Sequence, residues 1–225
     1  MDIRTATRFG KRLWTGGFLA FGGFHPEPAD SVPDLECGRP ARTLLVIGNA
    51  GAAMWTAFQQ APEARDGVAD PLDRYTRRVL LEVAHEFSLG ALFPFDGAPW
   101  FPFAEWARKA GGFSPSPMGL LAHHRYGPWA GFRAAFISTD RSGTFAAQAL
   151  PGPCTSCTKK PCITTCPAGA LSLSGYDVPL CRGYLAANPD ASCHRGCLAR
   201  RACPVGTDFN QPDEMAAFHM RAFLG

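Results

Sequence analysis

Between residues 40 and 150, the pattern of apolar and polar positions predicts helices and strands that alternate regularly. The apolar run Thr43–Ile47 is followed by the turn residues Gly48–Gly51, which is typical of a buried strand. Further along, Asp70 and Pro71 predict the start of a helix, with Asp70 as N-cap and Pro71 at the first helical position. The core-facing stripe of this helix recurs at helical spacing and consists of Leu72, Tyr75, Val79, Val83 and Phe87.

Three further elements follow in the same region. Ala91–Phe95 is interpreted as a second strand, and Trp100–Ala110 as a short helix that ends at Gly111 and Gly112. Phe132–Ile137 is predicted to be a third strand. Helices that alternate with strands favour an α/β or α+β layer.

Length and composition narrow the possible classes of protein. The chain has 225 residues, of which 46% are hydrophobic and 18% charged, with a net charge of +3. This suits one large domain, or a medium domain with a small module. The charge is too weak to indicate a nucleic acid or a membrane as partner, and no apolar run reaches the roughly 18 residues of a membrane helix. The apolar stretch Gly16–Phe24 lacks a cleavage site. We therefore expect a soluble, cytoplasmic protein.

Cysteine is the most informative residue type. The chain has nine, and all but Cys37 fall between Cys154 and Cys203. Disulfides would require an oxidising compartment, which nothing in the N-terminal sequence indicates. Reduced thiolates that bind metal are the better interpretation.

The spacing of these cysteines predicts two iron–sulfur clusters. Cys154, Cys157, Cys162 and Cys166 form a first motif that ends in Pro167; Cys181, Cys193, Cys197 and Cys203 form a second that ends in Pro204. In two-cluster ferredoxins the cysteine before proline binds the other motif's cluster. One [4Fe–4S] cluster would therefore take Cys154, Cys157, Cys162 and Cys203, and the other Cys166, Cys181, Cys193 and Cys197. Such a ferredoxin-like module would transfer single electrons. Two zinc sites of four thiolates each are the alternative.

Basic residues accompany the cysteines. Six of them stand between Cys154 and Cys203, against the two acids Asp177 and Asp190; they are Lys159, Lys160, Arg182, Arg195, Arg200 and Arg201. They could compensate the negative charge of the clusters. They could also form a docking face for an acidic electron donor such as a flavodoxin or a ferredoxin.

Three segments resemble parts of one family of cobalamin enzymes. Cys181–Leu185, between the two cysteine motifs, resembles the ferredoxin part of epoxyqueuosine reductase, a relative of the reductive dehalogenases. That family joins such a module to a nitroreductase-like domain that binds cobalamin. Its Asp-x-x-Pro segment is similar to Asp96–Pro99, and its Gly-Ser-Trp segment to Gly127–Trp129. The long helical tail of that enzyme has no counterpart here.

A longer stretch resembles the vitamin B12-processing CblC family. Asp70–Asp73 is similar to its Asp-Pro-Val-Asp segment, and His123–Arg133 to its His-Pro-Arg-Phe-Gly-Gly-Trp-Phe-Ala-Ile-Arg run. The resemblance covers residues ~40–140. It implies an α+β fold with a nitroreductase-like domain over residues 1–150. The cysteine motifs predict that the two-cluster ferredoxin-like module follows after the linker Pro151–Pro153, at 151–225. The CblC family has no clusters of its own.

The resemblance also implies a corrinoid site. Asp96 would be catalytic, as a proton donor or a ligand of an axial water, although a single carboxylate after a strand could equally be a cap. Arg133 matches an arginine linked to thiol binding in the family. His123 would be structural rather than a cobalt ligand. The implied corrinoid contacts are Asp96, Phe101, Pro102, Phe103, Ala104, Pro115, Ser116, Pro117, Leu121, Phe132 and Arg133; for Phe101 and Phe103 an ordinary core role is the alternative.

Together these features predict a cobalamin-binding iron–sulfur reductase of the B12-processing type. Electrons from a protein donor would reduce Co(III) to Co(II), with loss of an upper ligand such as cyanide. Two alternatives stay open at this point. Cobalamin could be a permanent cofactor for reduction of an organic substrate, or the chain could be an electron carrier of the ferredoxin type.

Overall fold

The computed structural model describes residues 3–143 and 151–225. Met1–Gly111 clusters with Gly131–Ala149 in one unit, and Gly112–Ala130 clusters with Leu150–Gly225 in another. We call these the sheet unit and the cysteine unit. The predicted domain boundary at residue 150 lies in 144–150, outside the described residues. The two units differ from the predicted domains, because the segment Gly112–Ala130 belongs to the unit that contains the cysteine motifs.

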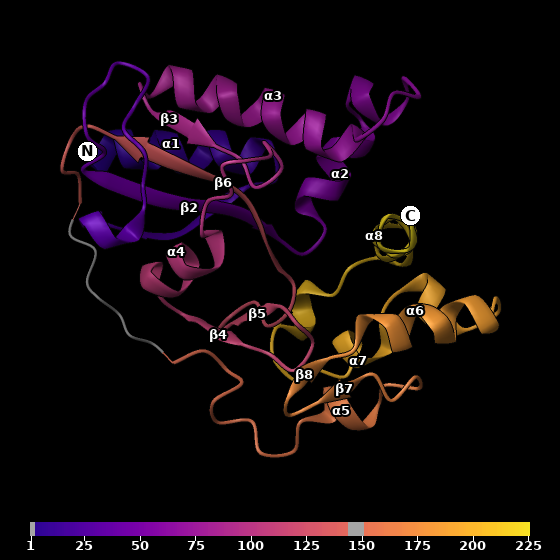
Figure 1. Ribbon diagram of the computed structural model, residues 1–225. Coiled ribbons are helices and arrows are strands. Elements are labelled where there is room, and N and C mark those ends of the chain that lie inside the picture. Colours follow the sequence, from indigo (N-terminus) through magenta and orange to yellow (C-terminus); the bar gives the residue numbers. More distant parts are fainter. Residues whose placement is uncertain (1–2, 144–150) are drawn as a thin grey trace. The chain divides into compact units, whose positions relative to one another are not determined.

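The sheet unit is built on a four-stranded sheet in the order β1-β2-β6-β3. Figure 1 shows α1 and α3 on one face of this sheet and α4 on the other. Strand β2 runs through its interior, as the apolar pattern predicted, and β6 confirms the strand predicted at Phe132–Ile137. The strands are β1 (Leu19–Phe24), β2 (Thr43–Ala50), β3 (Gly90–Leu92) and β6 (Ala130–Ser138), and the helices are α1 (Ile3–Thr15), α2 (Ala53–Gln59), α3 (Pro71–Glu86) and α4 (Phe103–Ala110), with 3-10 turns at Pro28–Asp30 and Pro62–Ala64.

Helix α3 supplies the apolar layer over the sheet. Its predicted stripe is confirmed in that Leu72, Tyr75, Val79 and Val83 are buried. The Tyr75 hydroxyl donates a hydrogen bond to the Gly16 carbonyl at 3.0 Å, which satisfies its one buried polar atom.

Glycine is required where β2 meets β6. A Cβ on Gly48 would lie 2.1 Å from the Gly131 carbonyl oxygen, which is too close for any side chain. The two central strands can therefore approach only because residue 48 has no side chain.

The predicted start of helix α3 is confirmed, with Asp70 at the N-cap position and Pro71 as the first helical residue. Asp70 has φ 52, and its side chain makes no capping hydrogen bond; its carbonyl accepts the first helical bond from Arg74 N at 3.0 Å.

Two details of the sequence prediction are wrong. Strand β3 ends at Leu92, because Asp96 closes a turn that includes Pro94. Helix α4 begins at Phe103 rather than at residue 100, since the residue before a proline is disfavoured in helical conformation.

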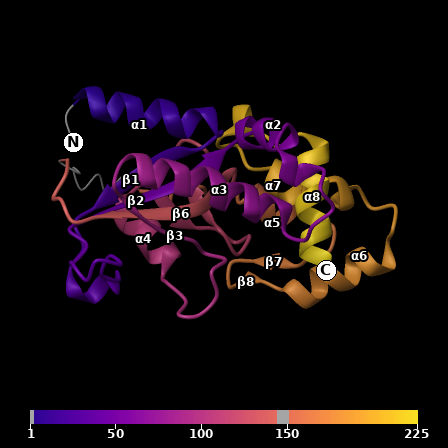
Figure 2. The ribbon, with the colours of Figure 1, turned by 90° about the horizontal axis from the view of Figure 1, so that it is seen from above.

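The cysteine unit consists of short elements. Two hairpins, β4 (Phe113–Pro115) with β5 (Leu121–His123) and β7 (Leu171–Ser172) with β8 (Gly175–Tyr176), are antiparallel. The helices are α5 (Pro161–Thr164), α6 (Val178–Ala187), α7 (Leu198–Arg201) and α8 (Asp213–Leu224), with 3-10 turns at Ser192–Arg195 and Thr207–Phe209. The C-terminal end of α8 reaches β8 (Figure 2), where Phe223 stacks on Tyr176 with ring centroids 6.4 Å apart.

The segment Gly112–Ala130 is tied to the rest of the cysteine unit through its backbone. Gly127 has φ 54, and a Cβ there would lie 2.0 Å from the Val205 carbonyl oxygen. Ser114 Oγ accepts a hydrogen bond from Cys154 N at 3.2 Å. The predicted linker Pro151–Pro153 is packed at its centre, because a Cβ on Gly152 would lie 2.2 Å from Ser114 N.

Candidate functional site

Four cysteines line a small cavity in the cysteine unit. Cys154 and Cys157 come from the loop before α5, Cys162 from α5, and Cys203 from the loop after α7. The cavity has a volume of about 20 Å³, and Lys160 also lines it. We call it the first cysteine cavity. Its four cysteines are the set that spacing predicted for one cluster.

The other four cysteines line a second, larger cavity. Its volume is about 220 Å³, and Cys166, Cys181, Cys193 and Cys197 contribute to its wall. Most of the remaining wall is apolar: Met118, Leu120, Pro167, Ala168, Leu171, Leu185, Ala199, Met220 and Phe223, with Tyr176, Tyr184, Arg200 and His219 as its other members. We call it the second cysteine cavity.

The two cavities are neighbours. Met118 lines both of them. It belongs to a buried apolar cluster with Leu171 and Ala199, which also contains Cys162 from the first set. Cys166 and Cys197 from the second set pack against the same cluster. The sulfur-bearing side chains are thus part of the core of this unit.

Burial and backbone N–H groups act in opposite directions on the pKa of the thiols. Burial raises the pKa of Cys203, and the nearby Cys154, Cys162 and Cys157 raise it further, whereas the N–H of Val205 lowers it. Cysteines of one set therefore influence one another.

The second set behaves in the same way. Burial raises the pKa of Cys197, and Cys193 and Cys166 add to this increase, while the N–H groups of Arg200 and Ala199 lower it. Backbone donors thus face sulfur in both sets, which favours a thiolate once a positive centre is present.

No disulfide joins any of the nine cysteines, all of which lie in the described part of the chain. Among the described residues, no three His, Cys, Asp or Glu side chains converge closely enough to hold a single metal ion. The cysteines of each set surround a cavity rather than a point.

Several of the predicted basic residues make contacts within the cysteine unit. Lys160 donates to the Cys154 carbonyl, and Arg200 donates to the Pro128 carbonyl at 2.6 and 2.9 Å while lying over the Trp129 ring. Arg201 is paired with Asp213 at 2.6 Å. Lys159 and Arg195, in contrast, are exposed.

Asp96 has the cap-like role that the sequence left open. Its Oδ2 accepts a hydrogen bond from Phe93 N at 3.1 Å, and Oδ1 is paired with Arg77. The Arg77 guanidinium also lies 4.8 Å from the centre of the Phe93 ring. Asp96 therefore closes the turn after β3; its catalytic role stays a prediction.

The aromatic residues predicted to contact a corrinoid differ in availability. Phe103, with Pro102 before it and the exposed Ala104 after it, is 8% exposed and packs on Trp106, as an ordinary core residue would. Phe101 is half-buried and stacks on Trp106, with ring centroids 5.7 Å apart.

Two predicted residues lie on β6. Phe132 is half-buried and meets Phe21 edge to face at 6.3 Å. Arg133 donates from Nε to Asn49 Oδ1 at 2.8 Å. Desolvation lowers the pKa of Arg133, and the charge of the nearby Asp73 opposes this decrease. Desolvation also raises the pKa of Asp73.

The other predicted contacts belong to the cysteine unit. Ser116 and Pro117 line the first cysteine cavity, next to the exposed Pro115, and Leu121 is half-buried on β5. The predicted corrinoid contacts are therefore divided between the two units.

His123 is structural, in agreement with the sequence interpretation. Its ring is buried, and Nδ1 accepts hydrogen bonds from Arg125 N at 3.1 Å and Tyr126 N at 3.3 Å. Desolvation, followed by the charges of His124 and Arg125, lowers its pKa to about 4. The ring is therefore neutral at physiological pH.

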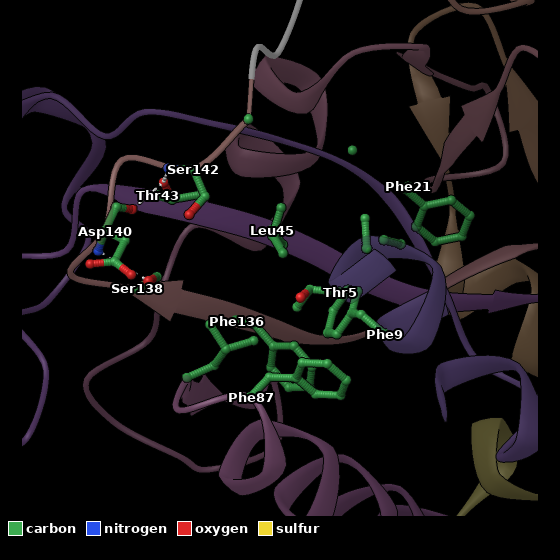
Figure 3. A pocket seen from close by; sticks show the side chains of 15 residues that line it. Thr5, Phe9, Phe21, Thr43, Leu45, Phe87, Phe136, Ser138, Asp140 and Ser142 are labelled. Carbon is green, nitrogen blue, oxygen red and sulfur yellow. Dashed lines mark hydrogen bonds between the residues drawn. The ribbon is translucent and has the colours of Figure 1, made fainter. Parts of the chain in front are cut away.

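The sheet unit has a cavity of its own, of about 490 Å³ (Figure 3). Phe9, Phe21, Phe87 and Phe136 give it an aromatic wall. At its polar end, Thr43 Oγ1 accepts from Ser142 N at 3.0 Å and donates to the Asp140 carbonyl at 2.7 Å. None of the residues predicted to contact a corrinoid lines this cavity.

Sequence reasoning missed two residues of the cysteine cavities. Met118 and Tyr176 stand outside both cysteine motifs, and no spacing rule connects them to sulfur. Burial raises the pKa of Tyr176, and the neighbouring Cys181 raises it further. A tyrosine five residues before a predicted ligand was the one available signal.

Comparison with known proteins identifies the fold. No family model matches the sequence, and no curated protein matches it. Among solved structures, a C. elegans B12-trafficking protein CblC, described as a homologue of human MMACHC, superimposes with a TM-score of 0.54. The match covers 99% of this chain and 98% of that chain at 12% identity. The chain thus has a mixed α+β fold that resembles CblC. None of its described helices has the length and apolar character to cross a membrane.

Proposed function

We propose that this chain is a corrinoid-binding iron–sulfur reductase of the B12-processing type. The observation that carries the proposal is the gathering of eight cysteines into two sets of four, each around its own cavity. These are the sets that result when the cysteine before each proline crosses to the other motif.

The donor set fits a [4Fe–4S] cluster better than zinc. A zinc ion needs four sulfurs at about 2.3 Å from one point, whereas a cube takes one thiolate at each of four irons. Ligands of a cube therefore surround a cavity, as those of the second set do around about 220 Å³, whereas the first cavity, with about 20 Å³, has room for about one water and would have to widen. Backbone N–H groups that face Cys197 and Cys203 match the hydrogen bonds that cluster sulfurs accept.

The arrangement of the two cavities supports electron transfer between them. Met118 lines both cavities, and the buried cluster around it contains Cys162 of the first set and contacts Cys166 and Cys197 of the second. The exposed Lys159 stands beside the loop of the first set, where an acidic flavodoxin or ferredoxin could dock. Lys160 is engaged with the Cys154 carbonyl and belongs to the cavity wall rather than to the docking face.

A corrinoid is proposed as the electron acceptor. The fold resembles that of a B12-trafficking protein over nearly the whole chain, and the run His123–Arg133 resembles a CblC motif. In the sheet unit, Phe101 and Phe132 have half-buried rings that could contact a corrin, and Arg133 could hold one of its polar groups. Phe103 is committed to the core and is the weakest of the expected contacts.

The chemistry at cobalt is a one-electron reduction of Co(III) to Co(II), after which an upper ligand such as cyanide leaves as the anion. The protein donor supplies the electron, and the chain supplies orientation and a path. Cobalamin is the substrate in this proposal. A test has to distinguish this role from two others, in which cobalamin is a permanent cofactor or the chain is a pure electron carrier.

The test uses the full chain, purified and reconstituted without oxygen. A deletion after residue 149 would separate Gly112–Ala130 from its own unit, so point variants are cleaner. We expect cyanocobalamin to bind, and a reduced flavodoxin to release cyanide with appearance of the Co(II) spectrum. Cys166→Ser and Cys203→Ser should each abolish the donor-dependent rate and keep corrinoid binding, whereas Cys37→Ser should change neither.

Each other outcome selects a different function. Equal decyanation by both cysteine variants would remove the clusters from the path. Lack of corrinoid binding at tens of micromolar, a threshold of about −6 kcal/mol, would favour the electron carrier. A corrinoid that stays bound through many turnovers of an organic substrate would make it a cofactor.

A further inference from the structure

The cavity of the sheet unit has no part in the proposed reductase. It is bounded by the first half of α1, by strands β1, β2 and β6, and by the residues that follow α3. All of its lining residues belong to the sheet unit, so its chemistry is independent of the cysteines. Its volume of about 490 Å³ lies within the range of about 300–1,000 Å³ that is typical of small-molecule sites. We call it the aromatic cavity.

Three phenylalanines of the wall form a corner of aromatic rings. The Phe9 ring meets the Phe87 ring edge to face, with centroids 5.2 Å apart and an angle of 83° between the planes. Phe136 also meets Phe9 edge to face, at 6.1 Å and 62°. A flat aromatic guest that stacks on one of these rings can present its edge to another, and both arrangements are favoured for aromatic pairs. An alkyl chain would gain only apolar contact from the same corner.

The polar end of the cavity offers few hydrogen bonds to a guest. Thr43 Oγ1 already donates to the Asp140 carbonyl and accepts from Ser142 N, and Ser138 Oγ accepts from Asp140 N at 3.1 Å. Figure 3 shows these residues gathered at one end of the cavity, away from the phenylalanine corner. Because these two hydroxyls bind the protein's own backbone, the affinity of a guest has to come mainly from its apolar surface.

The described wall of the cavity carries no positive charge. It contains no Lys, Arg or His, and its one charged residue, Asp140, is exposed. Arg8 lies 4.8 Å from the centre of the Phe87 ring, but it is not part of the wall and is paired with Glu86 at 3.5 Å. A phosphate, sulfate or carboxylate group would therefore be buried here without a partner of opposite charge, which is unfavourable. The wall selects for a neutral ligand.

We propose that the aromatic cavity is a binding site for a neutral, planar aromatic compound. The ring corner accounts for the aromatic character of this ligand, and the absence of cations from the described wall accounts for its neutrality. The site does not depend on the proposed function, because neither the cysteines nor the predicted corrinoid contacts line it.

The first experiment tests the two chemical properties of the ligand on the full chain. The fluorescent probe N-phenyl-1-naphthylamine is neutral, and 8-anilinonaphthalene-1-sulfonate has the same rings with an added sulfonate. We expect the neutral probe to bind at least about tenfold more tightly than the sulfonate. Equal affinities would overturn the claim of neutrality.

Displacement of the neutral probe separates aromatic from alkyl ligands. 2-Naphthol and 1-decanol have the same number of carbon atoms and one hydroxyl each, but only 2-naphthol is flat and aromatic. At equal free concentration, 2-naphthol should displace the probe and 1-decanol should leave most of it bound. Equal displacement by the two alcohols would overturn the claim of an aromatic site.

Tryptophan substitutions locate the bound probe. Ala6 on α1 lines the cavity, so Ala6→Trp should fill it and weaken binding of N-phenyl-1-naphthylamine at least about tenfold. Thr7→Trp is the matched control, since Thr7 is exposed on the same helix and is not part of the wall. Ala20→Trp fills the cavity from β1 and covers the case in which Ala6→Trp disturbs α1. Unchanged affinity in both filled variants, or no binding to the unaltered protein, would overturn the proposal.

Discussion

The sheet unit and the cysteine unit are stabilised in different ways. In the sheet unit, long elements such as the 16-residue helix α3 bury apolar side chains against a four-stranded sheet. In the cysteine unit, two of the helices have four residues each, and cysteines form part of the buried cluster. Small units with little apolar burial commonly depend on metals or disulfides. If the two-cluster proposal holds, we expect that only the cysteine unit needs its metal in order to fold.

Removal of metal should have the largest effect and should be confined to one unit. Binding of metal to thiolates contributes about 10 kcal/mol to folding in small metal-dependent domains. After chelation of iron under anaerobic conditions, amide hydrogen exchange in α6 and α8 should become fast, whereas exchange in α3 and β2 should stay slow. Equal loss of protection in both units would contradict the division of roles.

A core truncation in the sheet unit should act independently of metal. Leu80 is fully buried, so Leu80→Ala should lower the free energy of unfolding by about 2–5 kcal/mol. Urea denaturation followed by hydrogen exchange at α3 should give the same loss in the metal-bound and metal-free protein. The matched change in the other unit, Leu185→Ala, should be measurable only with metal bound.

Acid should weaken the cysteine unit through His123. Its pKa of about 4 lies below the ordinary value of 6.5, so the unfolded chain binds the proton more readily. The contribution of the neutral His123 ring to the free energy of unfolding is therefore fully present above pH 6.5. It falls as the pH drops towards 4, by about 1 kcal/mol between pH 7.5 and 5.5. Thermal denaturation at the two pH values measures the loss.

Two variants define the source of this acid sensitivity. His123→Asn retains an acceptor for Arg125 N and Tyr126 N and should remove most of the pH dependence. The exposed His85 of the sheet unit is the control, and His85→Gln should keep the dependence intact. An unchanged slope in His123→Asn would assign the effect to another group.

Charge reversal at the surface should have the smallest effect. Lys159→Glu should lower the rate of reduction by an acidic protein donor a few-fold and flatten its salt dependence, because electrostatic steering weakens. Lys11→Glu, an equivalent reversal on the exposed face of α1 in the sheet unit, should leave the rate unchanged. Reduction by dithionite should be equal in all three proteins; equal rates with the protein donor would remove Lys159 from the docking face.

The sequence predicted the sheet unit where periodicity was strong. The stripe of α3 and the apolar run of β2 were sufficient to place both elements. The end of β3 and the start of α4 were predicted incorrectly. The turn closed by the Asp96 side chain ends β3, and the prolines before Phe103 delay the start of α4. Pairing of β1 with β2 depends on contacts between segments that no local pattern encodes.

In the cysteine unit, spacing predicted which cysteines come together but not their surroundings. The grouping of Cys203 with Cys154 and of Cys166 with Cys193 followed from a rule about the proline that comes after each crossing cysteine. Met118 and Tyr176 were missed because burial and side-chain direction, rather than spacing, bring them to the cavities. The basic residues could not be divided into internal and exposed groups without the structure, as Lys160 and Lys159 illustrate.

The iron content of the full chain tests the central claim most directly. Protein reconstituted without oxygen and freed of unbound metal should contain about eight iron and eight sulfide per chain, the content of two [4Fe–4S] clusters. Cys166→Ser and Cys203→Ser should each damage one cluster, and Cys37→Ser should keep the full content. Stoichiometric zinc, or about four iron in the unaltered protein, would contradict the two-cluster account.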